Sequence, residues 1–214
     1  MKQDLRDKRK DYSQNFINFT QVSDNPMELF NIWFANAMES SKISEPYAMN
    51  LATIGVNGFP KSRIVLLREA SNEGFSFYTN YESEKGKGIS GNSKVCLSFF
   101  WENLEQQIII KGIAEKLDGK NSDEYFQKRP RESQAGALVS QQSSILDFDV
   151  NLEEEVEKIL SNYEGKEIPR PAYWGGYLVK PVEIEFWQGR PSRLHDRLRY
   201  LLEDGKWVKE RLAP

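Results

Sequence analysis

Residues 47–68 read YAMNLATIGVNGFPKSRIVLLR. Apolar and polar side chains alternate through much of this stretch, on either side of Asn57-Gly58. An Asn-Gly pair between two such runs is a strong β-hairpin signal, because both residues tolerate the positive φ angles that the turn needs. The stretch therefore predicts two antiparallel strands, over Tyr47–Val56 and Lys61–Arg68.

The same period of two continues after this hairpin. It predicts three further strands, over Gly74–Thr79, Lys94–Trp101 and Gln106–Lys116. Segments this close together leave little room for crossover helices, so the strands should pair largely antiparallel. We therefore expect a mainly β fold that closes as a barrel or packs as a sandwich.

Helices are predicted on both sides of these strands. Asn25 can cap a helix over about 26–41, and Pro26 suits its first turn. The apolar face of this helix should hold Phe30, Trp33, Phe34, Ala37 and Met38.

Residues 121–144 also carry a helical pattern, which Pro130 interrupts. Because the residue before a proline is displaced from the helical region, one helix should end near Lys128 and another begin near Pro130. An acidic amphipathic helix is predicted over 152–163.

The C-terminal part of the chain returns to the strand pattern. Strands are predicted over Tyr177–Lys180, Val182–Gln188, Leu198–Leu202 and Lys206–Arg211. The last two flank Asp204-Gly205, which is a second hairpin signal.

The N-terminal residues 1–24 are polar and irregular and include the run Arg6-Asp7-Lys8-Arg9-Lys10. We expect them to form a solvated, partly mobile arm. Residues 25–214 show no internal repeat, no low-complexity tract and no clear boundary, so we expect a single domain there.

Composition excludes several classes of function. The 29 basic and 32 acidic residues give a net charge of −3, so binding to nucleic acid has no bulk electrostatic support. No apolar stretch approaches the length of a membrane span, and the N-terminus lacks the apolar core of a signal peptide. We therefore expect a cytoplasmic protein with no membrane partner.

One cysteine and one histidine limit the metal chemistry. Cys96 alone cannot form an internal disulfide or a multi-cysteine zinc site, and His195 alone cannot build a multi-histidine site. Cys96 lies in an apolar run and is expected to be a buried structural thiol rather than a nucleophile. We expect no bound metal.

Five groups of residues could carry chemistry. In the first, Arg63 and Arg68 enclose four apolar residues, and alternation predicts that they lie on opposite faces of a strand. In the second, a strand that ends in Tyr78-Thr79-Asn80 leads to Ser83 and Lys85, a pattern that can hold a phosphate. Solvated charges and an ordinary turn are the plain alternatives.

The third group is Tyr125, Arg129 and Ser133, which surround the break at Pro130. Arg129 should lie at one helix end and Ser133 in the first turn of the next helix, where unpaired amides favour an anion. A surface helix-turn-helix is the alternative. The fourth group, Ser140–Ser144, is rich in amides and hydroxyls that can bind a heterocycle or a phosphate, or it is simply a loop.

The fifth group lies near the C-terminus and holds the single histidine. Trp187 offers a stacking surface, and Arg193, His195 and Arg197 alternate, so an extended segment would point all three to one side. Three such cations need an anion or a carboxylate among them, and Asp196 would then point away. A wet basic strand face is the alternative.

These groups together resemble the pyridoxine/pyridoxamine 5′-phosphate oxidase family of FMN enzymes. The resemblance runs from about residue 8 to Pro214. Its motifs are RIVLLR at 63–68, FYTN at 77–80, QKRPRESQAGALVSQQSS at 127–144, PAYWGGY at 171–177, VEIEFWQG at 182–189, RLHDR at 193–197 and the terminal ERLAP. It implies an antiparallel, Greek-key-like split β-barrel and a homodimer with FMN at the interface.

The resemblance also implies which residues bind the ligands. For FMN it implies Arg63, Ile64, Val65, Leu66, Leu67, Arg68, Tyr78, Thr79, Lys85, Gln107, Gln142, Ser143, Trp187 and Arg197. For the substrate it implies Arg9, Lys10, Asp11, Tyr12, Arg68, Tyr125, Arg129, Ser133, Arg193, Leu194 and His195. Because Arg9–Tyr12 resembles a segment that can fold over the substrate, the arm would be a lid.

The implied reaction is oxidation of pyridoxamine 5′-phosphate and pyridoxine 5′-phosphate to pyridoxal 5′-phosphate. A hydride passes to FMN, and O2 reoxidises the flavin to give hydrogen peroxide. Of the catalytic residues, Arg193 would hold the substrate, His195 would hydrogen-bond it, and Arg197 would stabilise the reduced flavin. The alternatives are a related flavin reductase or oxidase with another substrate, and a non-catalytic module that binds flavin or vitamer phosphate.

Two positions depart from the family pattern. Arg68 stands where lysine is usual, which keeps the charge but changes its geometry. Glu84 precedes Lys85 where an arginine is usual, and so places a negative charge near the expected FMN phosphate. Either Glu84 points to solvent, or FMN binds more weakly, or another cation substitutes.

Overall fold

The computed structural model describes residues 3–8 and 10–214. The chain divides into two compact units. The terminal unit comprises Met1–Met49, Leu97–Lys111 and Pro181–Pro214, and the central unit comprises Asn50–Cys96 and Gly112–Lys180. Among the described residues, no helix is both long and apolar enough to cross a membrane.

The sheet contains nine strands. They are β1 (Ala48–Ile54), β2 (Pro60–Leu66), β3 (Glu69–Ser71), β4 (Gly74–Asn80), β5 (Lys94–Trp101), β6 (Gln106–Lys116), β7 (Trp174–Gln188), β8 (Asp196–Glu203) and β9 (Lys206–Leu212). Hydrogen-bonded neighbours follow the order β2-β1-β5-β6-β7-β4-β3, and β8 pairs with both β7 and β9. The β3–β4, β4–β7, β7–β8 and β8–β9 pairings are antiparallel, which confirms the predicted mainly antiparallel β fold.

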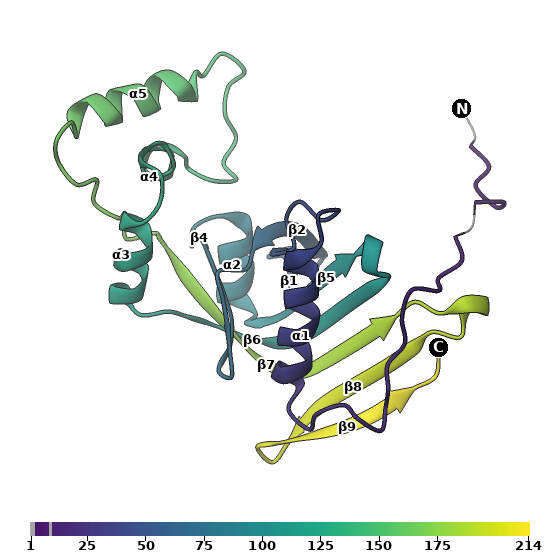
Figure 1. The fold of residues 1–214 in the computed structure, drawn as a ribbon. Coiled ribbons are helices and arrows are strands. Elements are labelled where there is room, and N and C mark those ends of the chain that lie inside the picture. The colour runs from purple at the N-terminus through teal and green to yellow at the C-terminus, as the bar shows by residue number, and fades with distance from the viewer. Residues whose placement is uncertain (1–2, 9) are drawn as a thin grey trace. The chain divides into compact units, whose positions relative to one another are not determined.

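The terminal unit contains helix α1 (Pro26–Glu39), two short 3-10 turns and the β8–β9 hairpin (Figure 1). The predicted cap of α1 is confirmed, because the side chain of Asn25 accepts a hydrogen bond from Met27 N. Phe30, Trp33 and Ala37 are buried on one face, and the Trp33 ring lies 5.3 Å from that of Phe186. Met38 falls at the edge of that face and is 52% exposed.

The central unit carries helices α2 (Glu84–Gly91), α3 (Gly119–Gln127), α4 (Arg131–Val139) and α5 (Leu152–Asn162). The break at Pro130 is confirmed, since α3 ends at Gln127 and Pro130 is the residue that precedes α4. Helices α4 and α5 lie side by side (Figure 1). Phe126 and Trp174 form the centre of a small apolar core beneath these helices.

Helix α2 was not predicted, because three of its eight residues are glycines, which have low helix propensity. Close packing explains two of them. A Cβ at Gly86 would lie 2.1 Å from the carbonyl oxygen of Tyr81, and one at Gly88 would lie 2.9 Å from that of Ile54. The Ser83 side chain caps the helix by accepting a hydrogen bond from Gly86 N.

Strand β7 was predicted as two strands but is continuous through Pro181. Its pairing with β4 ends at Val179, and its pairing with β8 begins at Glu183. Pro181, which has no N–H to donate, therefore falls between the two ladders and interrupts neither of them.

Candidate functional site

The central unit contains a cavity of about 290 Å³. Most of the residues of this unit that the sequence assigned to FMN or substrate line it. It is lined by Ile64, Val65, Leu66, Arg68, Tyr78, Thr79, Asn80, Lys85, Tyr125, Arg129, Gln142 and Trp174. Arg63, Leu67, Ser133 and Ser143 do not line it. Strand β2 supplies one wall, the end of β4 and the start of α2 supply a second, and the α3–α4 junction supplies a third.

Lys85 brings a buried ammonium group to this cavity. It lies in the first turn of α2 and is 8% exposed. Its Nζ donates to Ser83 Oγ at 3.3 Å and to Gln142 Oε1 at 3.2 Å, and no described carboxylate lies within ion-pair distance of it. Burial lowers the pKa of Lys85 to about 8, and the nearby Arg63 charge acts in the same direction. A buried cation of this kind is ready to bind an anion.

Arg129 brings a second cation to the cavity. Its guanidinium lies 4.6 Å from the centre of the Trp174 ring, and burial lowers its pKa. Its Nη1 atom is buried and has no hydrogen-bond partner within the described part of the chain. A buried donor without a partner is costly, so this atom indicates that a ligand oxygen completes the site.

The α3–α4 junction holds Arg129 in place. The side-chain amide of Gln134 donates to Gln127 O at 3.2 Å and to Arg129 O at 2.9 Å. These bonds satisfy carbonyls that the break at Pro130 leaves free of the helical ladder. Sequence reasoning missed Gln134, although an amide one turn into a helix that follows a proline is a usable signal.

Aromatic rings form one side of the same cavity. The rings of Tyr78 and Tyr125 stack with centres 4.0 Å apart, and Tyr78 also stacks on Trp174 at 5.5 Å. Arg68 lies with its guanidinium 5.7 Å from the Tyr125 ring. A cavity with flat rings, an apolar strand and the three cations Arg68, Lys85 and Arg129 suits a planar, phosphorylated ligand.

The pattern around Arg63 differs from the prediction. Strand β2 ends at Leu66, so Arg68 lies beyond it, where its backbone N donates to Ser76 O at 2.9 Å. The two arginines therefore do not lie at the two ends of one strand. The Arg63 guanidinium donates to Leu51 O at 3.2 Å and to Thr53 Oγ1 at 2.7 Å, and burial lowers its pKa.

Glu84 forms an ion pair with Lys61, whose Nζ lies 2.5 Å from Glu84 Oε2. The hydrogen bond from Lys61 lowers the pKa of Glu84, and Arg63 and Lys85 act in the same direction. Both side chains are partly exposed. Lys61 therefore offsets the negative charge that Glu84 adds at this position.

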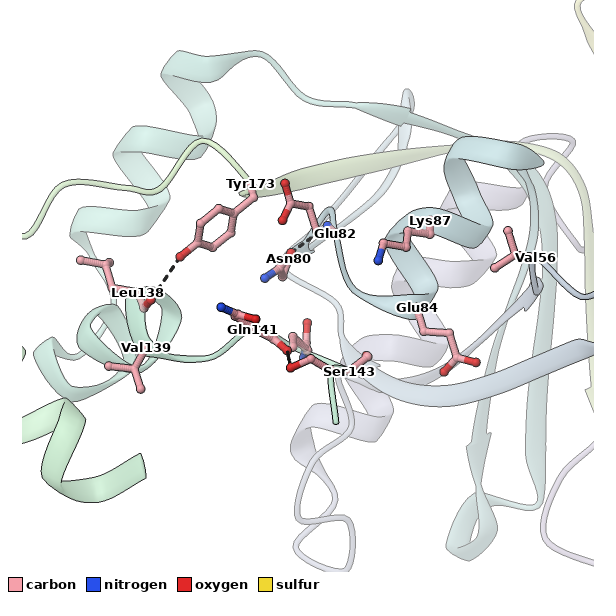
Figure 2. A pocket seen from close by; sticks show the side chains of 12 residues that line it. Val56, Asn80, Glu82, Glu84, Lys87, Leu138, Val139, Gln141, Ser143 and Tyr173 are labelled. Carbon is pink, nitrogen blue, oxygen red and sulfur yellow. Dashed lines mark hydrogen bonds between the residues drawn. The ribbon is translucent and has the colours of Figure 1, made fainter. Parts of the chain in front are cut away.

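A larger cavity of about 770 Å³ lies beside Glu84 (Figure 2). Asn80 and Gln142 line both cavities of the central unit. On the α4 side, the Tyr173 hydroxyl donates to Leu138 O at 3.2 Å and thereby fixes the end of that helix (Figure 2). Ser143 lines this cavity and has a φ of 74°, so the Gln142–Ser143 segment turns sharply here.

The terminal unit contains a separate cavity of about 550 Å³ around the single histidine. It is lined by Lys8, Lys10, Asp11, Tyr12, Arg190, Ser192, Arg193 and His195. Arg9 lies outside the described residues. Leu194 is 67% exposed and Gln107 is half-buried in β6, and neither lines this cavity.

His195 is held from several sides. Its Nδ1 accepts a hydrogen bond from Arg190 N at 3.1 Å, which leaves Nε2 to carry the proton of the neutral ring. Burial and the nearby Arg193 charge lower the pKa of His195. The rings of Trp187 and Tyr12 lie 4.7 and 5.8 Å from the histidine ring. The neutral form is thus favoured near neutral pH.

The predicted alternation of three cations on one face is wrong. Residues Pro191–Arg193 form a 3-10 turn, in which Ser192 and Arg193 have φ angles of 56° and 61°, so this part is not extended. Arg197 lies in β8 and pairs with Glu185 at 2.8 Å, which raises the pKa of the arginine. Asp196 is buried and accepts from Ile17 N at 3.1 Å.

Solved structures define the class of the fold. The chain is similar to PhzG from Burkholderia lata 383, solved in complex with tetrahydrophenazine-1-carboxylic acid, with a TM-score of 0.88 and 29% identity. The similarity covers 96% of this chain and 100% of that one. The fold is thus the split barrel with flanking helices that the sequence predicts.

Sequence comparison then defines the family. Residues 37–162 match the family model described as pyridoxamine 5′-phosphate oxidase. Residues 174–214 match the model described as the pyridoxine 5′-phosphate oxidase C-terminal dimerisation region. The chain belongs to the pyridoxamine 5′-phosphate oxidase family, which confirms the resemblance seen in the sequence.

Two relatives match over nearly their whole length. The pyridoxine/pyridoxamine 5′-phosphate oxidase of Flavobacterium johnsoniae is 52% identical over 98% of this chain and 99% of its own length. That of Flavobacterium psychrophilum is 50% identical over 99% of both chains.

Proposed function

We propose that this protein oxidises pyridoxamine 5′-phosphate and pyridoxine 5′-phosphate to pyridoxal 5′-phosphate, with FMN as its cofactor. The two Flavobacterium relatives that are named for this activity are about half identical to this chain over nearly its full length. The observation that carries the proposal is that two cations, the buried Lys85 and the half-buried Arg129, line one cavity of the central unit. One cation serves the phosphate of each ligand.

The residues around Lys85 fit FMN. We assign the cofactor phosphate to Lys85 and to the adjacent Gln142–Ser143 turn, because Lys85 is buried with only neutral partners. The flavin ring would lie along Ile64–Leu66 and beside Tyr78. When bound, FMN supplies the acceptor for a substrate hydride and the route by which electrons reach O2 to give hydrogen peroxide.

The residues around Arg129 bind and orient the substrate in this proposal. The Arg129 guanidinium takes the substrate phosphate together with Tyr125, Ser133 and Arg68. An anchor remote from the reacting carbon supplies orientation without taking part in the chemistry. This role accounts for the unpartnered Nη1 atom of Arg129.

The terminal unit supplies groups for the reacting end of the substrate. Arg193 holds the substrate, and the neutral His195 donates a hydrogen bond from Nε2. Arg197 would place a positive charge beside FMN and so favour negative charge on it, and the bond of Arg197 to Glu185 keeps its head group oriented. Gln107 and Trp187 complete the cofactor contacts, and Lys10, Asp11 and Tyr12 of the arm cover the substrate, with Arg9.

The protein acts as a homodimer with FMN at the interface in this proposal. The matched dimerisation region, residues 174–214, contains Trp187, Arg193, His195 and Arg197. Residues assigned to cofactor and substrate thus lie in the segment that the family uses to dimerise. A second copy of the chain would complete each site.

The absorption spectrum of the purified protein tests the proposal. We expect a yellow protein whose flavin band bleaches when pyridoxamine 5′-phosphate is added without oxygen and returns when air is admitted. A colourless protein that takes up no FMN would contradict the proposal. Bleaching by unphosphorylated vitamers as fast as by phosphorylated ones would favour an oxidase with another substrate, and flavin binding without bleaching would favour a non-catalytic module.

A further inference from the structure

The N-terminal arm is fastened to the terminal unit by a buried carboxylate. Glu105 is 2% exposed, although glutamate is rarely buried without a purpose. Its Oε2 accepts hydrogen bonds from two successive backbone amides of the arm, Ser13 N at 2.8 Å and Gln14 N at 3.0 Å. Bonds from amides to an ionised acceptor are among the stronger hydrogen bonds in proteins.

The backbone of Glu105 is fixed as firmly as its side chain. The residue ends the 3-10 turn Glu102–Leu104 with a φ of 55°. Its carbonyl accepts from Gly189 N at 2.7 Å and from Gln188 Nε2 at 3.1 Å. Glu105 therefore joins the arm directly to the end of β7, two residues beyond Trp187.

Tyr12 immediately precedes the two anchored amides. Its ring meets Trp187 edge-on at 5.6 Å and lies 5.8 Å from His195. A Cβ at Gly189 would lie 2.7 Å from the Tyr12 ring and 3.1 Å from Glu105 Cβ, so the glycine leaves room for this contact. The position of the Tyr12 ring is thus determined by the anchor that follows it.

The arm has a second anchor further along. Ile17 N donates to the buried Asp196 at 3.1 Å, and Ile17 itself is 6% exposed. Beyond these two anchors, the Tyr200 hydroxyl donates to Ser23 O at 2.7 Å and Lys209 Nζ donates to Val22 O at 3.0 Å, so the arm is attached along its length from Ser13 onward. The arm residues that line the histidine cavity, which are Lys8, Lys10, Asp11 and Tyr12, lie before the first anchor.

We propose that Glu105 is a positioning residue for the oxidase reaction. Through the amides of Ser13 and Gln14 it sets Tyr12 against Trp187 and His195 and so closes the substrate cavity of the terminal unit. This inference rests on the proposed function, because the closed cavity matters for catalysis only if the substrate binds there. Glu105 touches neither the substrate nor the cofactor and acts on binding rather than on the chemical step.

The test compares Glu105→Ala and Glu105→Gln with Glu102→Ala as the matched control. Glu102 lies on the same turn, but its side chain is 70% exposed and its ion pair with the exposed Lys10 is long, at 3.8 Å. Glutamine keeps one acceptor oxygen and the volume of glutamate, so it should restore part of what alanine removes. It also keeps the test possible if the alanine variant does not fold.

The first readout is hydrogen exchange of the arm, measured by mass spectrometry on the peptide that contains Ser13 and Gln14. In Glu105→Ala we expect these amides to exchange at least about tenfold faster, with a smaller change in Glu105→Gln and none in Glu102→Ala. This measurement needs no substrate. Unchanged exchange in the alanine variant would overturn the anchoring itself.

The second readout is the split between KM and kcat for pyridoxamine 5′-phosphate. We expect KM to rise about tenfold in Glu105→Ala while kcat and the FMN content stay within about twofold, because the arm contributes to binding in ground and transition states alike. Faster exchange with an unchanged KM would overturn the positioning role. An inactive wild-type protein would instead overturn the proposed function, while the exchange result would still decide the anchoring.

Discussion

Lys61 Nζ lies 2.5 Å from Glu84 Oε2, although the two residues are 23 positions apart in the sequence. Lys61 thereby neutralises the carboxylate that lies between Ser83 and Lys85. Glu84 directly precedes Lys85, to which we assign the FMN phosphate. The ion pair with Lys61 therefore explains how that phosphate could bind beside a negative charge. Removal of Lys61 should expose that charge to the cofactor.

We expect Lys61→Met to weaken FMN binding by about threefold to tenfold, because Glu84 then repels the phosphate without a counter-ion. Glu84→Gln should bind at least as tightly as wild type, and the double variant should match Glu84→Gln. Quenching of flavin fluorescence measures each dissociation constant. If Lys61→Met is as harmful in the Glu84→Gln background as in wild type, Lys61 acts in some other way.

Lys85 should make FMN binding depend on pH. Its pKa in the ligand-free protein is lowered by burial to about 8, and only the protonated amine attracts a phosphate. Affinity should therefore be constant below pH 8 and fall above it, by about tenfold from pH 8 to pH 9 at most. Because arginine stays charged, Lys85→Arg should flatten this profile, whatever its absolute affinity.

The stability of the ligand-free protein should show the opposite dependence. Since the pKa of Lys85 is lower in the folded than in the unfolded chain, the unfolded chain binds more protons above pH 8. The contribution of Lys85 to the free energy of unfolding therefore rises with pH, from about pH 8 up to the ordinary pKa of a lysine side chain. Urea denaturation of wild type and Lys85→Met across this range isolates it, and equal slopes would contradict the lowered pKa.

Arg129→Gln should affect the substrate and spare the cofactor. Among the described cations of this cavity, Lys85 is assigned to FMN and Arg68 to both ligands, whereas Arg129 is assigned to the substrate phosphate alone. We therefore expect KM for pyridoxamine 5′-phosphate to rise about a hundredfold in the variant. FMN content should remain at the wild-type level. Weak turnover of unphosphorylated pyridoxamine, if measurable, should change little. Loss of FMN from the variant would mean that Arg129 serves the cofactor.

Gly136→Ala should stabilise the protein. Gly136 lies inside α4, and a Cβ there would meet nothing within 4 Å. Replacing a helical glycine with alanine in open space raises the free energy of unfolding by about 0.5–1 kcal/mol. Thermal unfolding measures the change, and a lower midpoint would contradict the prediction.

Much of the fold could be predicted because its signals are local. The Asn25 cap, the break at Pro130 and the turn at Asp204-Gly205 each depend on a few adjacent residues. Strands β5 and β6 begin and end where the alternation predicts.

The candidate site was harder to predict, because its contacts depend on register and on unusual backbone angles. Ser192 and Arg193 adopt positive φ angles that non-glycine residues seldom take, so the alternation of charges was misleading. Glu185 of β7 lies directly opposite Arg199 of β8, yet it forms its ion pair with Arg197, the diagonal neighbour two residues along β8. Only the register of these strands determines such a contact.

The two hydrogen bonds from Gln134 across the α3–α4 break mean that Arg129 is held before any ligand arrives. An anion that binds there orders little of the protein, so less conformational entropy is lost on binding. Substrate capture at Arg129 should then resemble docking to a rigid receptor.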